Sequence, residues 1–248
     1  MRTLKALSAL LTYPSGDLIE ALPDIVNQFA SDPLLKKADR LALSELITHL
    51  GDGDLFDRQE AYGLLFDRTR SLSLHLFEHV HGESRDRGQA MVDLIKLYED
   101  GGFSPTIEEL PDFLPLFLEF ASTREPQEAL DLIAQPAHVL TALSERLAKR
   151  QSPYQAIFQA LMTLAKAKPD AAALAALRAE PDPEPDDLEA LDAAWEEEMV
   201  TFGPDATSSC GVEGLGPKLR QARRPAPGLE PVPGAGPRTT IHHSGNRT

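Results

Sequence analysis

The chain has 248 residues, of which 42 % are apolar and 25 % are charged, a composition typical of a globular protein that can bury a sizeable core. Its single cysteine, Cys210, excludes an intramolecular disulfide and a multi-cysteine metal framework, and no apolar run reaches the roughly 18 residues of a membrane span. Residues 202–248 carry six Lys or Arg against three acids, so the net charge of −15 becomes −18 for residues 1–201, which disfavours nucleic acid and anionic membranes as partners.

Apolar side chains recur at helical spacing through the first hundred residues, and capping residues, prolines and glycines mark where each helix starts or stops. The pattern predicts a helix that ends at Tyr13-Pro14, a helix from Ser15 to Phe29, a helix opened by Asp32-Pro33 that runs to His49, a helix from Asp54, a helical segment from Ser71 to Val80, and a helix capped by Ser84 that ends at Gly101-Gly102. In the last of these, the inner face is predicted to be Met91, Leu94, Ile95, Leu97 and Tyr98.

Prolines divide the second half of the chain. A helical stretch from Ser104 through Phe120 must be interrupted or restarted at Pro111 and Pro115, because proline removes a backbone donor. Further helices are predicted after Pro126, after Pro136, from Ser152-Pro153 to Lys168, and over the Ala-rich residues 171–180. Alternating β-branched runs are nearly absent, so we expect an all-α fold class with a single helical-bundle domain over residues 1–180.

Composition changes sharply after this domain. PDPEPDD, residues 181–187, is an acidic Pro-rich linker, and residues 188–203 predict a short helix that docks on the domain. Residues 204–248 are rich in Gly and Pro and poor in large apolar residues, so their burial would not offset the entropy of ordering. We expect a disordered tail there.

The stretch LFEHVHGESRDRGQAM, residues 76–91, gathers titratable side chains that could suggest a metal or acid/base site. A metal site needs three or four converging ligands, whereas His75 and His79 form the only pair at helical spacing and His81 points elsewhere. An acid/base site lacks a nucleophile beside a base and a phosphate-binding Gly loop. We therefore expect no catalytic residue, metal or cofactor. Instead, Glu83, Arg85, Asp86 and Arg87 are expected to tie two helices together.

The same region carries a resemblance. FEHVHGESRDRGQAMVDL, residues 77–94, resembles the signature of the NarJ-type nitrate reductase molybdenum cofactor assembly chaperones, within the TorD-like family. LLTYPSGDL, YGLLFDRTRSLSLHLFEH, ELPDFLPLFLEFAS and WEEEMVTFG agree, so the resemblance covers about residues 1–203. The signature residues in this chain are Glu78, His79, His81, Gly82, Glu83, Arg85, Asp86 and Arg87.

The resemblance implies an all-helical, non-enzymatic chaperone of the cytoplasm that acts in anaerobic nitrate respiration. Such a chaperone binds the unfolded apo catalytic (alpha) subunit of respiratory nitrate reductase through its N-terminal segment and keeps it competent for molybdenum cofactor insertion before membrane docking. The cofactor belongs to the client, and neither nucleic acid nor a stable membrane association is expected. The acidic body fits a basic amphipathic client segment, although acidity alone can serve solubility. A general helical peptide-binding scaffold without a dedicated client is the alternative.

Aromatic and leucine side chains at helical spacing could line a groove for an amphipathic client helix. The candidate groove residues are Tyr62, Leu65, Phe66, Phe77, Leu114, Phe117 and Phe120. Plain helix core is the alternative for each of them.

One departure from the wider family concerns its Glu, Pro, Asp, His motif. The nearest match is Glu109, Pro111 and Asp112, with Phe113 at the place of the histidine. Phe113 can neither form a side-chain hydrogen bond nor titrate, so a role played through that histidine is not expected here.

Overall fold

The computed structural model describes residues 1–81, 85–104, 109–183, 187 and 189. The chain divides into two units, Met1–Ala194 and Trp195–Thr248, and every described residue belongs to the first. The predicted docking helix over residues 188–203 lies outside the described residues except for residue 189, and so does the predicted disordered tail over residues 204–248.

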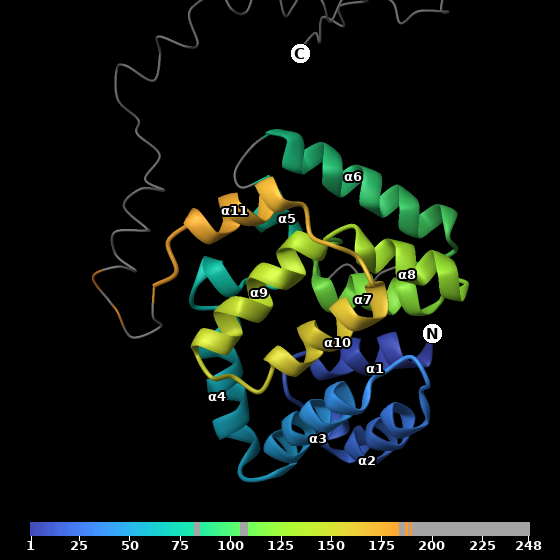
Figure 1. Ribbon diagram of the computed structural model, residues 1–248, viewed down its shortest axis with the longest axis vertical. Coiled ribbons are helices and arrows are strands. Elements are labelled where there is room, and N and C mark those ends of the chain that lie inside the picture. Colours follow the sequence, from blue (N-terminus) through green and yellow to red (C-terminus); the bar gives the residue numbers. More distant parts are fainter. Residues whose placement is uncertain (82–84, 105–108, 184–186, 188, 190–248) are drawn as a thin grey trace, which may run out of the picture. The chain divides into compact units, whose positions relative to one another are not determined.

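Helices make up almost all of the regular structure in the described residues (Figure 1). They are α1 (Arg2–Leu10), α2 (Gly16–Ser31), α3 (Lys37–Gly51), α4 (Leu55–Phe66), the 3₁₀ helix η1 (Arg70–Leu72), α5 (Leu76–Val80), α6 (Arg85–Asp100), α7 (Leu114–Ser122), α8 (Pro126–Ala134), α9 (Ala137–Lys149), α10 (Gln155–Ala165) and α11 (Ala171–Ala179). The prediction of an all-α fold is confirmed. Within the described part of the chain, none of these helices has the length and apolarity needed to cross a membrane.

Side-chain caps fix several helix starts where the sequence predicts them. The Ser15 hydroxyl accepts a hydrogen bond from the Leu18 amide at 3.2 Å at the start of α2. The Asp170 carboxylate accepts from the Ala173 amide at 2.7 Å and opens α11, and Asp54 caps α4 in the same way. Each bond satisfies an amide that has no partner within its helix, which is typically worth about 1 kcal/mol.

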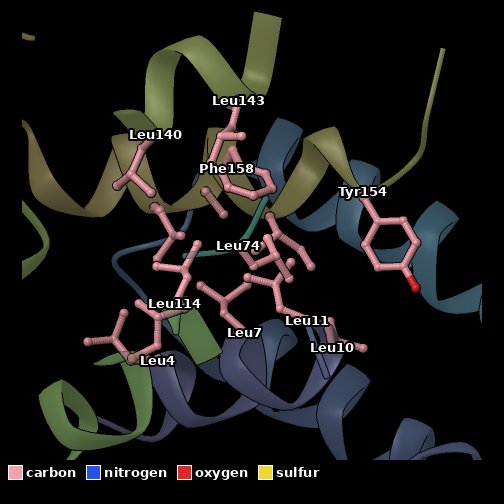
Figure 2. Packing of buried hydrophobic residues seen from close by; sticks show 14 of the residues in the cluster. Leu4, Leu7, Leu10, Leu11, Leu74, Leu114, Leu140, Leu143, Tyr154 and Phe158 are labelled. Atoms are coloured by element: carbon pink, nitrogen blue, oxygen red, sulfur yellow. The ribbon is translucent and has the colours of Figure 1, made fainter. Parts of the chain in front are cut away.

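Helix α1 contributes the fully buried leucines Leu4, Leu7 and Leu10 to the core. Helix α1 packs on α2 and α7, while α9 packs on α10 and α11. Figure 2 shows leucines of α1 facing side chains of α9 and α10, with Leu74 and Leu114 among them. The fully buried residues in this view include Leu4, Leu7, Leu10, Leu11, Leu114, Leu140 and Phe158. Burial of one such side chain contributes about 1.5–3 kcal/mol, so this contact is a main source of stability.

The third helix starts later than predicted. Asp32-Pro33 does not open it; α3 begins at Lys37. The buried Asp32 carboxylate instead accepts a hydrogen bond from the Leu34 amide at 2.8 Å and another from the Thr3 hydroxyl of α1. Asp32 thus stabilises a turn and holds that turn against α1, which competes with a helix-capping role.

The prediction of one helical segment from Ser71 to Val80 was wrong. The segment forms η1, then an extended stretch, then the short helix α5. The extended stretch pairs with the residues before α7: the Leu76 amide donates to the Asp112 carbonyl at 3.0 Å, and the Leu114 amide donates to the Leu74 carbonyl at 2.8 Å. These non-local hydrogen bonds replace the helical bonds that the local pattern favours.

Candidate functional site

The signature segment begins where two chain segments run side by side. His75, the residue before α5, forms an isolated antiparallel bridge with Phe113, the residue before α7. The two rings also stack, with centroids 5.3 Å apart and planes tilted by 36°. The bridge places Asp112 beneath α5, and this carboxylate organises the site.

Asp112 is completely buried. One carboxylate oxygen accepts a hydrogen bond from the Phe77 amide at 3.0 Å, which satisfies a donor at the start of α5. The other oxygen lies 3.2 Å from Nδ1 of His75. This hydrogen bond raises the pKa of His75 above its ordinary value, against the opposing effect of burial. The pair therefore favours a protonated imidazole beside a buried carboxylate.

An imidazole thus lies beside Asp112 although Phe113 takes the place of the histidine in the family motif. His75 supplies that imidazole from a different segment. The sequence pattern missed this arrangement, because it placed His75 on a helix with His79. Since His75 and Asp112 are 37 residues apart, no spacing rule connects them.

His79 has a different environment from His75. It is buried in α5, and its Nε2 lies 2.8 Å from the Ser73 carbonyl, which accepts a hydrogen bond from it. Burial lowers the pKa of His79 against the opposing effect of the Ser73 hydrogen bond, and the nearby Arg146 charge adds to the lowering. The neutral imidazole is therefore favoured. Among the described residues no three His, Cys, Asp or Glu side chains converge as a metal site would require.

An ion pair connects α5 with α6. The guanidinium of Arg87 lies 3.2 Å from the carboxylate of Glu78, and both side chains are about three-quarters buried. His81, at the end of α5, packs edge-on against Phe77 with ring centroids 5.4 Å apart. Asp86 is exposed at the start of α6. The signature residues Gly82 and Glu83, and the side chain of Arg85, lie outside what the structure describes.

The seven candidate groove residues lie in or against the core. Leu65 and Phe77 are partly buried; the buried members are Tyr62, Phe66, Leu114, Phe117 and Phe120. A client could contact the buried members only after neighbouring helices separate. The groove therefore stays a prediction, and it applies to a conformation in which these helices have separated.

Three aromatic members of this set, Tyr62, Phe66 and Phe120, belong to two separate clusters. Tyr62 and Phe66 contact Tyr154, the residue before α10, and the ring centroids of Phe66 and Tyr154 lie 5.0 Å apart. Phe120 contacts Tyr98 of α6 at 4.7 Å and Phe103 at 5.8 Å. One continuous groove through all seven residues is thus not a feature of this state.

Helix α6 exposes apolar side chains that the sequence pattern assigned to its inner face. Among its described side chains only Leu94 and Tyr98 are buried, whereas Ile95 and Leu97 are each 39 % exposed and Val92 is 58 % exposed. Figure 1 shows α6 at the upper edge of the unit. At 100° per residue, Val92 and Ile95 lie on the same flank of the buried stripe.

The exposed flank has an acidic end. Glu99, also exposed, lies one turn beyond Ile95 on the side of Val92 and Ile95. We call Val92, Ile95 and Glu99 the α6 flank. The apolar arc of this helix is wider than one buried stripe, and this width is the sequence signal that could have revealed an exposed apolar flank.

The part of the chain that resembles known proteins includes α5, α6 and the residues before α7. A family model described as nitrate reductase delta subunit matches residues 32–160. The chain is 42 % identical over 211 residues to the nitrate reductase molybdenum cofactor assembly chaperone NarJ of Escherichia coli (strain K12), a match that spans 85 % of this chain and 88 % of that protein. The probable chaperone NarW of the same strain is 38 % identical over 210 residues, 85 % of this chain and 87 % of that protein. The probable chaperone NarJ of Bacillus subtilis (strain 168) is 31 % identical over 164 residues, 64 % of this chain and 86 % of that protein.

Proposed function

This chain belongs to the nitrate reductase delta subunit family, and we propose that it is a system-specific assembly chaperone for a respiratory nitrate reductase. In this proposal it binds the N-terminal segment of the apo catalytic subunit in the cytoplasm and keeps that subunit competent for molybdenum cofactor insertion before membrane docking. The chaperone is not an enzyme and holds no cofactor of its own. The observation that carries the proposal is the similarity over most of the chain to relatives named as such chaperones.

The α6 flank is the surface that suits a client in the described state. Val92 and Ile95 offer apolar area on a regular helix, which is the kind of surface that an amphipathic helix binds. Glu99 and the net charge of −18 on residues 1–201 suit basic side chains on the client. We therefore propose that a basic amphipathic client segment makes its first contact at the α6 flank.

Phe120, one of the buried groove residues, fits a second step. The pair formed by Glu78 and Arg87 and the hydrogen bond from the Tyr98 hydroxyl to the Pro111 carbonyl, 2.6 Å long, hold α6 against the unit. If the client displaces α6, Phe120 beneath Tyr98 becomes accessible. The part of the predicted groove at Phe120 would thus open when α6 moves away.

Client capture with matched variants tests the proposal. The full chain is used to capture proteins from cells grown anaerobically with nitrate, as wild type, as Val92→Gln/Ile95→Gln, and as the control Leu34→Gln/Leu41→Gln. Leu34 and Leu41 are also exposed, but they lie before and within α3. We expect wild type to enrich the nitrate reductase catalytic subunit, the α6 variant to bind it roughly tenfold more weakly because apolar contacts are lost, and the control to match wild type.

Two outcomes would contradict different parts of the proposal. Equal capture by the α6 variant and the control would show that the client binds elsewhere. Capture of many unrelated amphipathic proteins with no preference for the catalytic subunit would instead favour a general peptide-binding scaffold.

A further inference from the structure

A cluster of basic side chains lies at the carboxyl end of α9, in a chain that is otherwise strongly acidic. Arg146 and Lys149 belong to the last turn of α9, and Arg150 follows directly. We call these three residues the α9 basic cluster. Cations at this end of a helix are favoured by its dipole, but the partners of this cluster indicate a binding role as well.

The acidic segment after α11 occupies the α9 basic cluster. The Asp182 carboxylate accepts three hydrogen bonds: from Ser71 of η1 at 2.8 Å, from Lys149 at 3.2 Å and from Arg150 at 2.7 Å. Glu180 adds a longer contact of 3.4 Å to Arg146. One carboxylate thus meets a hydroxyl, an ammonium and a guanidinium from two separate elements, a donor set that suits any small oxyanion.

These interactions outweigh the cost of burying the carboxylate. Burial alone would raise the pKa of Asp182, yet hydrogen bonds from Ser71, Arg150 and Lys149 hold that pKa below its ordinary value. Because the pKa of Asp182 is lowered overall, the surroundings favour the ionised carboxylate over the neutral acid.

Arg146 is held in place by more than its acidic partner Glu180. Only 8 % of the Arg146 side chain and 6 % of the Arg150 side chain are exposed. Arg146 donates to the Ser71 carbonyl at 2.7 Å and to the Leu177 carbonyl at 2.5 Å, both neutral backbone acceptors. Arg146 would therefore stay fixed, with its charge less compensated, if the acidic segment left.

We propose that the α9 basic cluster together with Ser71 is an oxyanion-binding site that Asp182 occupies in cis, and that an external phosphate monoester or carboxylate binds there when Asp182 is withdrawn. Asp182 lies three residues beyond the end of α11 at Ala179. Such a short tether gives an effective concentration in the mM range or above, so a dilute free anion does not displace it. Helix α11 itself packs on α9 and buries Leu174 and Leu177, which anchors this tether.

Binding of inorganic phosphate to the full chain tests this site. Phosphorus NMR titrations at constant ionic strength compare wild type, Asp182→Ala and Glu145→Ala. The last variant is the matched control, because it also removes one carboxylate, but this carboxylate pairs with Arg178 of α11 and not with the α9 basic cluster. We expect Asp182→Ala to bind phosphate at least about tenfold more tightly than wild type, and Glu145→Ala to bind it as wild type does.

A second pair of variants separates the site from a general charge effect. Adding Arg150→Gln to Asp182→Ala should abolish the gain in affinity. Adding Lys149→Gln to Asp182→Ala serves the same purpose. The Lys149 side chain is 56 % exposed, so its loss leaves the fold intact. Titrations with acetate distinguish the ligand source: a gain confined to phosphate assigns the site to phosphate monoesters, and an equal gain assigns it to carboxylates.

The proposal is overturned if Asp182→Ala and wild type bind both anions equally, since Asp182 would then mask nothing. It is also overturned if the gain survives Lys149→Gln and Arg150→Gln. Neither result bears on client binding at the α6 flank, because the two sites share no residue.

Discussion

Asp112 has a structural role, although acidic residues are rarely buried completely. It satisfies the amide at the start of α5 and holds the His75 imidazole. The family motif pointed to Asp112 and to the unusual Phe113, but it could not identify His75 as the hydrogen-bond partner of Asp112. Local patterns report contacts a few residues apart, whereas this contact depends on the chain bringing two distant extended segments together.

The two histidines of this site should give stability opposite dependences on pH. The pKa of His75 is raised, chiefly by its hydrogen bond to Asp112, so its contribution is full below pH 6.5 and is lost as pH rises through the raised pKa. The pKa of His79 is lowered by burial, so its contribution is full above pH 6.5 and is lost as pH falls through the lowered pKa. Stability from this pair is therefore greatest near pH 6.5.

Melting temperatures between pH 6.5 and 8.5 test the part of this dependence that belongs to His75. Wild type is expected to lose about 1 kcal/mol on this limb, or roughly 2–4 °C, and His75→Gln is expected to lose clearly less. His138→Gln is the control: burial lowers the pKa of His138, so it does not contribute to the alkaline limb. Equal slopes for wild type and His75→Gln would show that the hydrogen bond to Asp112 does not favour the imidazolium.

At the scale of elements, the sequence predicted most helices but not how each one packs. Caps such as Ser15 and Asp170 act within a few residues, so they are readable from the pattern. Asp32 and the segment from Ser71 to Val80 were misread, because their polar groups are satisfied by α1 and by residues 112–114. The face of α6 was misread for a related reason: periodicity shows that a helix is amphipathic without showing how wide a stripe its neighbours cover.

Two glycines at opposite ends of α6 give a sharp test of its packing. A Cβ added at Gly101 would lie 2.7 Å from Cε2 of Phe120 and 2.8 Å from a guanidinium nitrogen of Arg124, whereas one added at Gly88 meets nothing within 4 Å. Gly101→Ala is therefore expected to lower the free energy of unfolding by about 1–3 kcal/mol. Gly88→Ala is expected to raise it by about 0.5–1 kcal/mol through helix propensity.

Chemical denaturation of the two variants measures these changes side by side. The predicted loss at Gly101 depends on close contact with Phe120 and on Arg124, which also donates to the Gly101 carbonyl at 2.6 Å. If Gly101→Ala matches Gly88→Ala in stability, the end of α6 does not pack closely against Phe120 of α7.

At the scale of the whole molecule, the fold class was predictable because period-3.6 stripes and helix breaks recur along the chain while alternating strand patterns do not. The site was predictable only as a region. Its signature letters identified α5 and α6, but the exposure of Ile95 and the occupation of the α9 basic cluster by Asp182 depend on the assembled helices. Net charge, by contrast, can be counted directly from the sequence. It shows an acidic body, which suits basic partners.

Calorimetry with the client peptide tests the central claim most directly. A peptide from the N-terminus of the nitrate reductase catalytic subunit is titrated into the full chain at low and high salt and at three temperatures. We predict binding with a negative heat-capacity change, because apolar area is buried, and a moderate loss of affinity at high salt, because exposed charge pairs contribute about 0–1 kcal/mol each and are screened. No binding, or binding with a heat-capacity change near zero and no salt dependence, would contradict the account.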